Sequence, residues 1–149
     1  EMCKMHIIRK HLALKCKKEN LADTYGTFDG GPRVPQIADI LTDYRYNIAI
    51  ENYIDDFYFT EKIMNCFASM TVPIYCGATK IAKFFNPDGI ITLKSDDLDN
   101  LEKILKQCSK EDYEQRLPAI KENYEKALDY INIDDMLYKK VKDLQQKSA

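Results

Sequence analysis

The sequence lacks the features that mark several large classes of protein. It has no tryptophan, only five glycines and five prolines, and no internal repeat, which excludes a fibrous repeat and a disordered chain. Long hydrophobic runs are also missing, because the most apolar stretch, residues 72–76, is far shorter than the roughly 20 residues of a membrane-spanning helix. We therefore expect a segment that folds in water and contains no membrane span.

An excess of positive charge is absent as well. Lys and Arg number 22 against 24 Asp and Glu, which gives a net charge of −2. Proteins that bind nucleic acid gain affinity by releasing counterions from phosphates, and this requires a basic surface. The charge balance therefore predicts no nucleic-acid partner.

Cysteines are few, and their pattern gives no sign of a disulfide framework. There are five, an odd number, and no two form a CxxC pair. Reduced cysteines that pack in a core are usual in a reducing compartment. The pattern favours a bacterial-type cytoplasm over the Golgi lumen, which would need an anchor outside this segment.

A metal site near the N-terminus is excluded by geometry. Its candidate ligands are Cys3, His6, His11 and Cys16. On a helix that turns by about 100° per residue, these side chains point in widely separated directions and cannot converge on one ion. The sequence therefore predicts no metal.

The first part of the chain is predicted to be a helix followed by a turn. A length of 149 residues accommodates one domain and is too short for two full-sized ones. Residues 1–20 combine basic residues with apolar ones at helical spacing, which predicts an outer amphipathic helix. Residues 21–25 are compatible with a short strand. The densest turn signal follows at residues 29–32, directly before Arg33.

The centre of the chain has the spacing of a strand–helix–strand unit. Residues 46–50 predict a buried strand, residues 51–59 a polar and aromatic loop, and Thr60 the start of a helix. The next strand covers residues 72–76 and closes at Gly77. This spacing is typical of a crossover between two parallel strands.

The alternation of strands and helices continues toward the C-terminus. A third strand is predicted over residues 90–93 and an amphipathic helix from near Asp97. Pro118 is expected to start or kink a helix rather than to lie inside one. Apolar residues at helical spacing continue in the tail and include Met136, Leu137, Val141 and Leu144. The fold class is therefore α/β, a Rossmann-like parallel sheet flanked by helices, with a helical C-terminal tail.

Lys62 is unusual for its place in the first turn of the predicted helix. The helix dipole favours Asp or Glu there, and a residue that breaks such a local rule often marks a site. A cation beside free backbone N–H groups suits a phosphate or pyrophosphate. The alternative is a plain surface pair between Lys62 and Glu51 or Glu61.

Glu51 and Asn52 directly follow the first buried strand, at the carboxyl end where open parallel sheets bind ligands. A carboxylate and an amide there can bind the hydroxyl groups of a sugar or ribose. The alternative is that both residues cap a turn. Gly77 lies alongside them, at the end of the neighbouring strand.

Four segments together resemble the signature of glycosyltransferase family 10, the α1,3/4-fucosyltransferases. They read YRYNIAIEN at residues 44–52, YFTEKI at 58–63, VPIYCG at 72–77 and FNPDGII at 85–91. The family pattern is roughly K-F/Y-x-x-x-F/I-E-N, D-Y-x-T-E-K-I/L, V/I-P-I/V-Y-W-G and F-x-P-x-S-F-I. The resemblance covers at least residues 20–95, in the same order and spacing.

The resemblance implies that residues 1–149 are a single nucleotide-sugar donor-binding domain, the C-terminal half of a two-domain GT-B enzyme. Such an enzyme transfers fucose from GDP-fucose to a glycan hydroxyl and inverts the anomeric centre. By the same resemblance Tyr58, Glu61 and Lys62 contact the donor, with Lys62 at the diphosphate, and Arg33 is the candidate for a second diphosphate contact. If these two cations stabilise the departing GDP, no metal or other cofactor is required.

Three positions depart from the family pattern. Tyr53 replaces the usual small hydroxyl residue, Phe57 stands where Asp or Gly is common, and Cys76 replaces the Trp before Gly77. These departures leave open a donor sugar other than fucose.

The resemblance implies that the general base belongs to an N-terminal acceptor domain that does not precede residue 1 of this sequence, and we expect the first strand of the donor domain to be missing as well. We therefore expect nucleotide binding without efficient transfer from this segment alone, and no catalytic residue within it. The alternative function is a non-catalytic nucleotide- or glycan-binding α/β module derived from such an enzyme. A purely structural α/β domain would leave Lys62 and the Glu51-Asn52 pair as coincidences.

Overall fold

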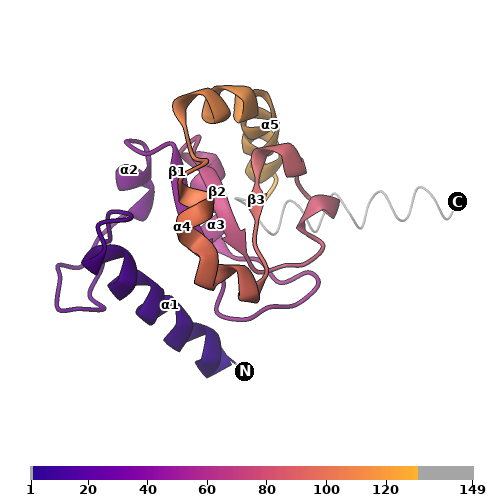
Figure 1. The fold of residues 1–149 in the computed structure, drawn as a ribbon. Helices are drawn as coiled ribbons and strands as arrows, with labels where there is room; N and C mark the ends of the chain where they lie inside the picture. Colours follow the sequence, from indigo (N-terminus) through magenta and orange to yellow (C-terminus); the bar gives the residue numbers. More distant parts are fainter. Residues whose placement is uncertain (1, 131–149) are drawn as a thin grey trace, which may run out of the picture.

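The structure, a computed structural model, describes residues 2–130 of the chain (Figure 1). Its helices are α1 Met2–Lys18, α2 Ile37–Leu41, α3 Glu61–Ala68, α4 Leu101–Leu105 and α5 Lys110–Leu128. Its strands are β1 Tyr46–Ile50, β2 Val72–Cys76 and β3 Ile91–Thr92, and its 3₁₀ turns are η1 Ile81–Lys83, η2 Pro87–Gly89 and η3 Ser95–Asn100. Over the described part of the chain, no helix is long and apolar enough to cross a membrane.

The three strands form one parallel sheet in the order β1-β2-β3. Tyr46 lies opposite Val72 and Ile50 opposite Cys76, so β1 and β2 are paired along their whole length. All five residues of β2 are buried, as expected for a central parallel strand that is covered on both faces. The predicted strands at residues 46–50 and 72–76 are confirmed with the same bounds.

Helices cover both faces of the sheet and confirm the predicted α/β class. On one face, Ile63 and Phe67 of α3 pack with Tyr75 of β2 in a core that also includes Ala127 of α5. On the other face, residues of α1 and α4 pack with Ile74 and Cys76. Neighbouring residues of β2 thus serve two different cores, because successive side chains of a strand point to opposite faces.

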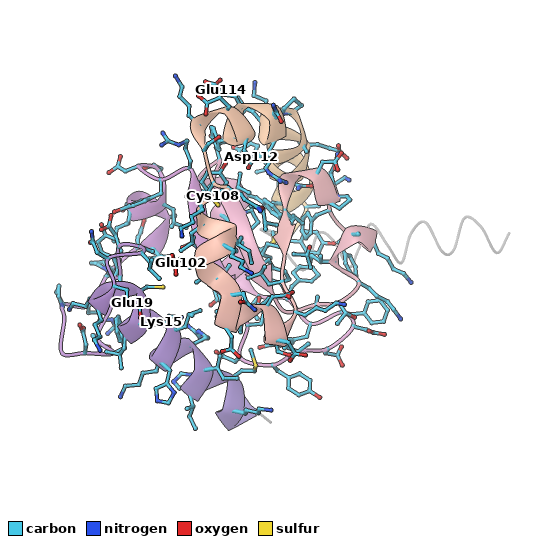
Figure 2. All side chains as sticks on the ribbon, in the orientation of Figure 1. Lys15, Glu19, Glu102, Cys108, Asp112 and Glu114 are labelled. Atoms are coloured by element: carbon cyan, nitrogen blue, oxygen red, sulfur yellow. The ribbon has the colours of Figure 1, made fainter. Side chains whose placement is uncertain are left out.

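The start of α5 is tied to the start of β1. The hydroxyl of Tyr46 donates to the carbonyl of Ser109 and to Asp112, each at 2.8 Å. Burial and the hydrogen bond to Asp112 raise the pKa of Tyr46, so the phenol stays neutral. Figure 2 shows Asp112 at the first turn of α5, close after Cys108. These hydrogen bonds hold the first residue of β1 against the N-terminus of α5.

Three predicted elements differ in the structure. Residues 21–25 do not form a strand, because no strand of the described chain lies in register beside them to pair with their backbone. The third strand is shorter than expected and comprises only Ile91–Thr92. The helix predicted from near Asp97 begins as the turn η3 and becomes α-helical only at Leu101, and the predicted helical positions Met136, Leu137, Val141 and Leu144 lie outside the described residues.

The expectation for Pro118 was wrong, because this residue lies inside α5. Proline has no N–H to donate to the carbonyl of Glu114, one turn earlier. The helix nevertheless continues, because its next turns are buried: Ile120 and Asn123 are both inaccessible to solvent. The Asn123 side chain accepts from the amide of Asn86 at 2.6 Å and donates to its carbonyl at 2.9 Å. Tertiary contacts therefore outweigh the local preference.

We expect Pro118→Ala to raise the free energy of unfolding by about 1–2 kcal/mol. Alanine restores the missing helical hydrogen bond, worth up to about 3 kcal/mol, and loses about 0.4–1 kcal/mol because the unfolded chain becomes less restricted. Little packing is lost, since Pro118 is exposed. Urea unfolding followed by circular dichroism measures the difference. Gln115→Ala, at another exposed position of α5, is the control and should change stability by a few tenths of a kcal/mol at most. A less stable Pro118→Ala protein would contradict the prediction.

Candidate functional site

Most of the residues singled out from the sequence gather at the carboxyl ends of β1 and β2. Glu51 and Asn52 follow β1, Gly77 follows β2, and Lys62 lies in the first turn of α3. The amide of Glu51 donates to the carbonyl of Cys76 at 2.8 Å, which holds the two strand ends side by side. In open α/β sheets, this edge is where ligands bind.

Glu51 is fully buried, which the sequence did not indicate. One carboxylate oxygen accepts from the amide of Thr60 at 2.9 Å and the other from the Thr60 hydroxyl at 2.7 Å. Lys62 Nζ lies 3.2 Å from the second oxygen. In this structure Glu51 therefore holds the start of α3 and the Lys62 side chain, and it does not face solvent.

Gly77 leaves the space that the Glu51 side chain occupies, because it has no side chain of its own. A Cβ at position 77 would lie 2.4 Å from the Tyr75 hydroxyl and 2.5 Å from Cγ of Glu51. Real Cβ atoms do not approach other atoms this closely, so only glycine fits beside the Glu51 side chain. The Tyr75 hydroxyl, in turn, accepts from the amide of Ala78 at 3.0 Å. Gly77 thus serves the site through close packing.

Lys62 is held by three oxygen atoms. Its Nζ lies 2.9 Å from Oγ1 of Thr60 and 3.2 Å from both Glu51 and Glu61. Its side chain is 17% exposed, whereas that of Glu61 is 70% exposed and that of Glu51 is inaccessible. Lys62 therefore pairs with both acidic residues, and only the partner on the outside, Glu61, can move away without unpacking the core.

Thr60 and Glu61 shape the start of α3. Thr60 is the N-cap, and its hydroxyl accepts from the amide of Lys62. Partial burial raises the pKa of the Glu61 carboxyl, but hydrogen bonds from Lys62 and from its own backbone outweigh burial and the pKa is lowered. The carboxylate is therefore ionised and remains a hydrogen-bond acceptor above its depressed pKa.

Arg9 is a site residue that sequence reasoning missed. It lies on α1, far from the motifs in the chain, and its guanidinium donates to Oδ1 of Asn52. The contact joins residues 43 positions apart, and the only hint in the sequence is the basic character of the first helix. It adds a second cation to the edge that holds Lys62.

Tyr58 lies in a loop of aromatic residues beside the site. It is 41% exposed, and its ring packs edge to face on Tyr53 with 6.3 Å between ring centroids. The loop is fixed at its base, because the carboxylate of Asp56 pairs with Lys80 at 2.5 Å. The exposed rings of Phe57 and Tyr58 therefore lie on a loop that the Asp56–Lys80 pair holds in position.

Arg33 is not brought to the other predicted residues. It is exposed in the segment between the glycine turn and α2, and it makes no hydrogen bond or ion pair with the rest of residues 2–130. The structure thus assembles Glu51, Asn52, Glu61, Lys62 and Gly77, with Tyr58 at their rim, and leaves Arg33 apart.

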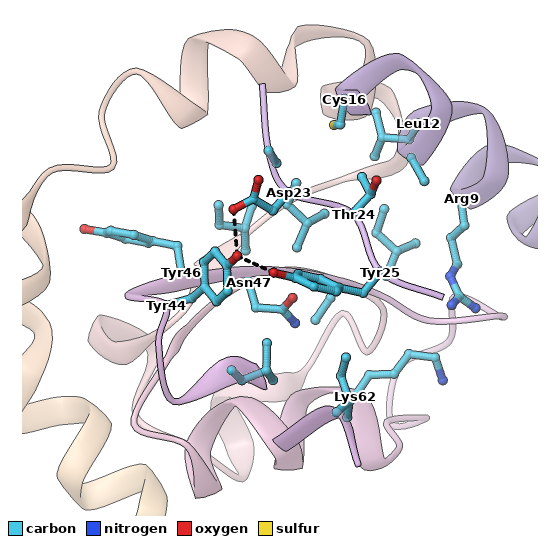
Figure 3. Close-up of a pocket in the computed structure, with 18 of the residues that line it drawn as sticks. Arg9, Leu12, Cys16, Asp23, Thr24, Tyr25, Tyr44, Tyr46, Asn47 and Lys62 are labelled. Atoms are coloured by element: carbon cyan, nitrogen blue, oxygen red, sulfur yellow. Dashed lines mark hydrogen bonds between the residues drawn. The ribbon is translucent and has the colours of Figure 1, made fainter. Parts of the chain in front are cut away.

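A hollow of about 1120 Å³ runs along β1 from this site. Arg9 and Lys62 lie toward one end of it, and Tyr44 lies at the other, where β1 begins (Figure 3). The Tyr44 hydroxyl donates to Asp23 at 2.6 Å and lies 2.6 Å from the Tyr25 hydroxyl. The hydrogen bond to Asp23 is the main cause that raises the pKa of Tyr44.

Four of the five cysteines are packing residues, as predicted. Cys16, Cys66 and Cys76 are buried and Cys108 is partly buried, and none of the four forms a disulfide. Burial raises the pKa of Cys66 to about 12 and that of Cys76 to about 11, which makes both thiols poor nucleophiles at neutral pH. Among residues 2–130, no group of three His, Cys, Asp or Glu side chains is arranged to hold a metal ion.

The sequence is similar to those of known fucosyltransferases. The C-terminal domain of glycosyltransferase family 10 (fucosyltransferase) matches residues 1–117. Alpha-(1,3)-fucosyltransferase FucT of Helicobacter pylori is 36% identical over 63 residues, which are 42% of this chain and 13% of that protein.

Two solved structures share the fold. An α1,3-fucosyltransferase with GDP-fucose superposes with a TM-score of 0.57 at 26% identity, over 76% of this chain and 35% of that chain. An α1,3-fucosyltransferase with GDP gives a TM-score of 0.64 at 24% identity, over 81% of this chain and 41% of that chain. This chain therefore spans less than half the length of each of these three proteins.

Proposed function

Because the chain belongs to glycosyltransferase family 10 as its C-terminal, fucosyltransferase domain, we propose that it is the donor-binding half of an inverting fucosyltransferase. The donor is GDP-fucose and the acceptor is a hydroxyl of a glycan. Residues 1–149 form one nucleotide-sugar-binding domain. The general base and the acceptor-binding surface belong to an N-terminal domain of the same protein.

One observation carries the proposal: the ammonium of Lys62 is held at the carboxyl ends of two parallel strands by the buried carboxylate of Glu51, 3.2 Å away. A buried counter-charge is costly unless it is paired and hydrogen-bonded, and Glu51 has both kinds of partner. Its role is to fix one cation beside the N-terminus of α3. A cation fixed beside the positive end of a helix dipole suits a diphosphate.

The diphosphate must replace one present partner of Lys62. The ammonium donates hydrogen bonds to Thr60 and Glu61 and forms an ion pair with Glu51, so three oxygen atoms already surround it. Glu61 is the exposed partner and gives way, which frees its carboxylate to accept a hydroxyl group of the donor. Tyr58 is exposed and Asn52 is partly exposed, and both are proposed to contact the sugar or ribose.

The cation that is proposed to bind the diphosphate also assists the transfer reaction. When the bond between the anomeric carbon and the phosphate oxygen breaks, negative charge builds up on the departing GDP. Lys62 stabilises this charge most where it develops, in the transition state. Arg33 is proposed as a further cation at the diphosphate, which it reaches only if its segment moves toward Lys62 when the nucleotide binds.

Donor screening by ligand-observed NMR tests the proposal on this chain. GDP and GDP-fucose should receive saturation from the protein, whereas UDP-glucose should not. Guanosine, which lacks both phosphates, is the matched control and should give a much weaker signal. A well-folded chain that transfers no saturation to GDP would contradict donor binding. A stronger signal from another GDP-sugar than from GDP-fucose would instead place the departures at Tyr53, Phe57 and Cys76 in the sugar pocket.

A further inference from the structure

We propose that the outer face of α1 docks on a membrane surface that carries anionic lipid headgroups. Five exposed residues define this face: Lys4, Ile7, Lys10, Leu14 and Lys18. In this arrangement the helix lies along the membrane surface without crossing the bilayer. None of these residues is proposed to bind the donor, so the inference is independent of the proposed function.

The five residues lie on one side of α1, which Figure 1 shows at the periphery of the fold. On a helix, residues three or four positions apart share a face, and successive members of this face are three or four residues apart. At about 1.5 Å per residue, the face is about 21 Å long from Lys4 to Lys18. The opposite side of α1 packs toward the sheet through Met5, Ile8, Leu12 and Cys16.

The positive charge of the outer face is not neutralised by the described part of the protein. Helix α1 contains six Lys or Arg residues and no acidic residue. Lysines directly after α4 and on α5 are instead paired with acidic residues one turn away, in the pairs Lys106–Glu102, Lys110–Glu114 and Lys126–Glu122. In contrast, Lys4, Lys10 and Lys18 form no ion pair with any side chain of residues 2–130. Their charge is therefore available to an external anion.

Two aliphatic side chains lie between these lysines and are left in contact with water. Ile7 is 56% exposed and Leu14 is 39% exposed. At a bilayer surface they would enter the boundary of the acyl chains, while the lysine stems extend the ammonium groups to the headgroups. A nucleic acid would offer phosphates but no apolar layer, and the net charge of −2 gives no general attraction to it. The combination of free cations and apolar side chains therefore fits an anionic membrane.

Binding of the 149-residue chain to lipid vesicles tests the inference. Vesicles of phosphatidylglycerol and phosphatidylcholine in equal parts are compared with vesicles of phosphatidylcholine alone by co-sedimentation. Each lysine near an anionic surface increases the affinity, so three lysines should give about a hundredfold tighter binding to the anionic vesicles. Salt at about 1 M should remove most of this difference, because it screens the charges. Equal binding to the two kinds of vesicle overturns the inference.

Two triple variants with the same net charge show whether α1 is the docking surface. The first changes the lysines of the outer face, Lys4→Gln, Lys10→Gln and Lys18→Gln, and should bind the anionic vesicles about a hundredfold more weakly. The control is Lys106→Gln, Lys110→Gln and Lys126→Gln, at exposed lysines that are already paired, and should stay within about threefold of the native affinity. Glutamine is a good helix former, so circular dichroism should show both variants folded. A control that loses as much affinity as the first variant overturns the inference.

A double variant separates a bilayer from a soluble polyanion. Ile7→Ser with Leu14→Ser keeps every charge, and it should lower the affinity for the anionic vesicles about tenfold or more, because two side chains no longer enter the apolar boundary. Binding to a DNA duplex, the polyanion probe, should be weak and unchanged by this variant. If vesicle binding is also unchanged, apolar contact with the bilayer is absent and the inference is overturned. It is overturned as well if the duplex binds the native chain as tightly as the anionic vesicles do, which would make a polyanion the partner.

Discussion

Glu51→Ala is expected to lower the free energy of unfolding by about 3–5 kcal/mol, the range for breaking a buried ion pair from one side. Glu51 is inaccessible to solvent, and its carboxylate accepts from the amide and the hydroxyl of Thr60 while it pairs with Lys62. Alanine leaves these donors without their partner and opens a cavity beneath the start of α3. Equilibrium urea unfolding of the two proteins measures the loss.

Two matched variants show whether burial is the cause. Glu51→Gln keeps the shape and one acceptor oxygen but removes the charge, so its loss should fall between those of the native protein and Glu51→Ala. Glu102→Gln breaks the pair between Glu102 of α4 and Lys106, the residue after this helix. Both side chains are at least half exposed, so the loss should be no more than about 0.5 kcal/mol. A loss below about 1 kcal/mol for Glu51→Ala would contradict the assignment of Glu51 as the buried anchor of α3.

The elements that could be predicted from the sequence are those with local signals. Residues 46–50 and 72–76 are apolar runs bounded by polar residues or glycine, and both are strands with the predicted bounds. Thr60 is an N-cap residue before an apolar face, and α3 begins directly after it. Each of these signals lies within a few residues of the element that it specifies.

The features that could not be predicted depend on residues far apart in the sequence. Glu51 is buried because Gly77, at the end of another strand, leaves room for it. Arg9 joins the site through the packing of α1, and Pro118 is tolerated because Asn123 ties α5 to Asn86. The sequence of residues 21–25 is compatible with a strand, but these residues do not form one because no described strand lies beside them to pair with. Periodicity and capping do not report such contacts.

Ion pairing and phosphate binding by Lys62 are compatible in this fold. The structure pairs Lys62 with a buried carboxylate and with an exposed one. The buried pair holds the ammonium in place and the exposed pair can be exchanged for another anion. A lysine in the first turn of α3 is unfavourable for the helix dipole, and Glu51 and Glu61 offset this cost.

Lys62→Ala is expected to weaken GDP binding by about ten- to a hundredfold, which corresponds to roughly 1.5–3 kcal/mol for a hydrogen bond between charged groups. The ammonium is 17% exposed and lies beside the first N–H groups of α3, so the diphosphate meets it in a partly desolvated place. Isothermal titration calorimetry with GDP measures the change. Binding of guanosine should be unaffected, because it has no phosphate. Lys106→Ala, directly after α4, should leave GDP affinity within twofold of the native value.

The loss of Lys62 also strands the buried carboxylate of Glu51, so stability and affinity must be separated. The double variant Glu51→Gln with Lys62→Ala removes the uncompensated charge, and its midpoint of unfolding should lie above that of Lys62→Ala alone. If Lys62 acts through its own charge, the double variant binds GDP as weakly as Lys62→Ala. If affinity returns when stability does, Lys62 is a structural partner of Glu51 and the diphosphate is bound elsewhere. Lys62→Arg retains the charge but not the compact geometry, and should restore only part of the affinity, because the planar guanidinium cannot direct its donors at Thr60, Glu51 and a phosphate together.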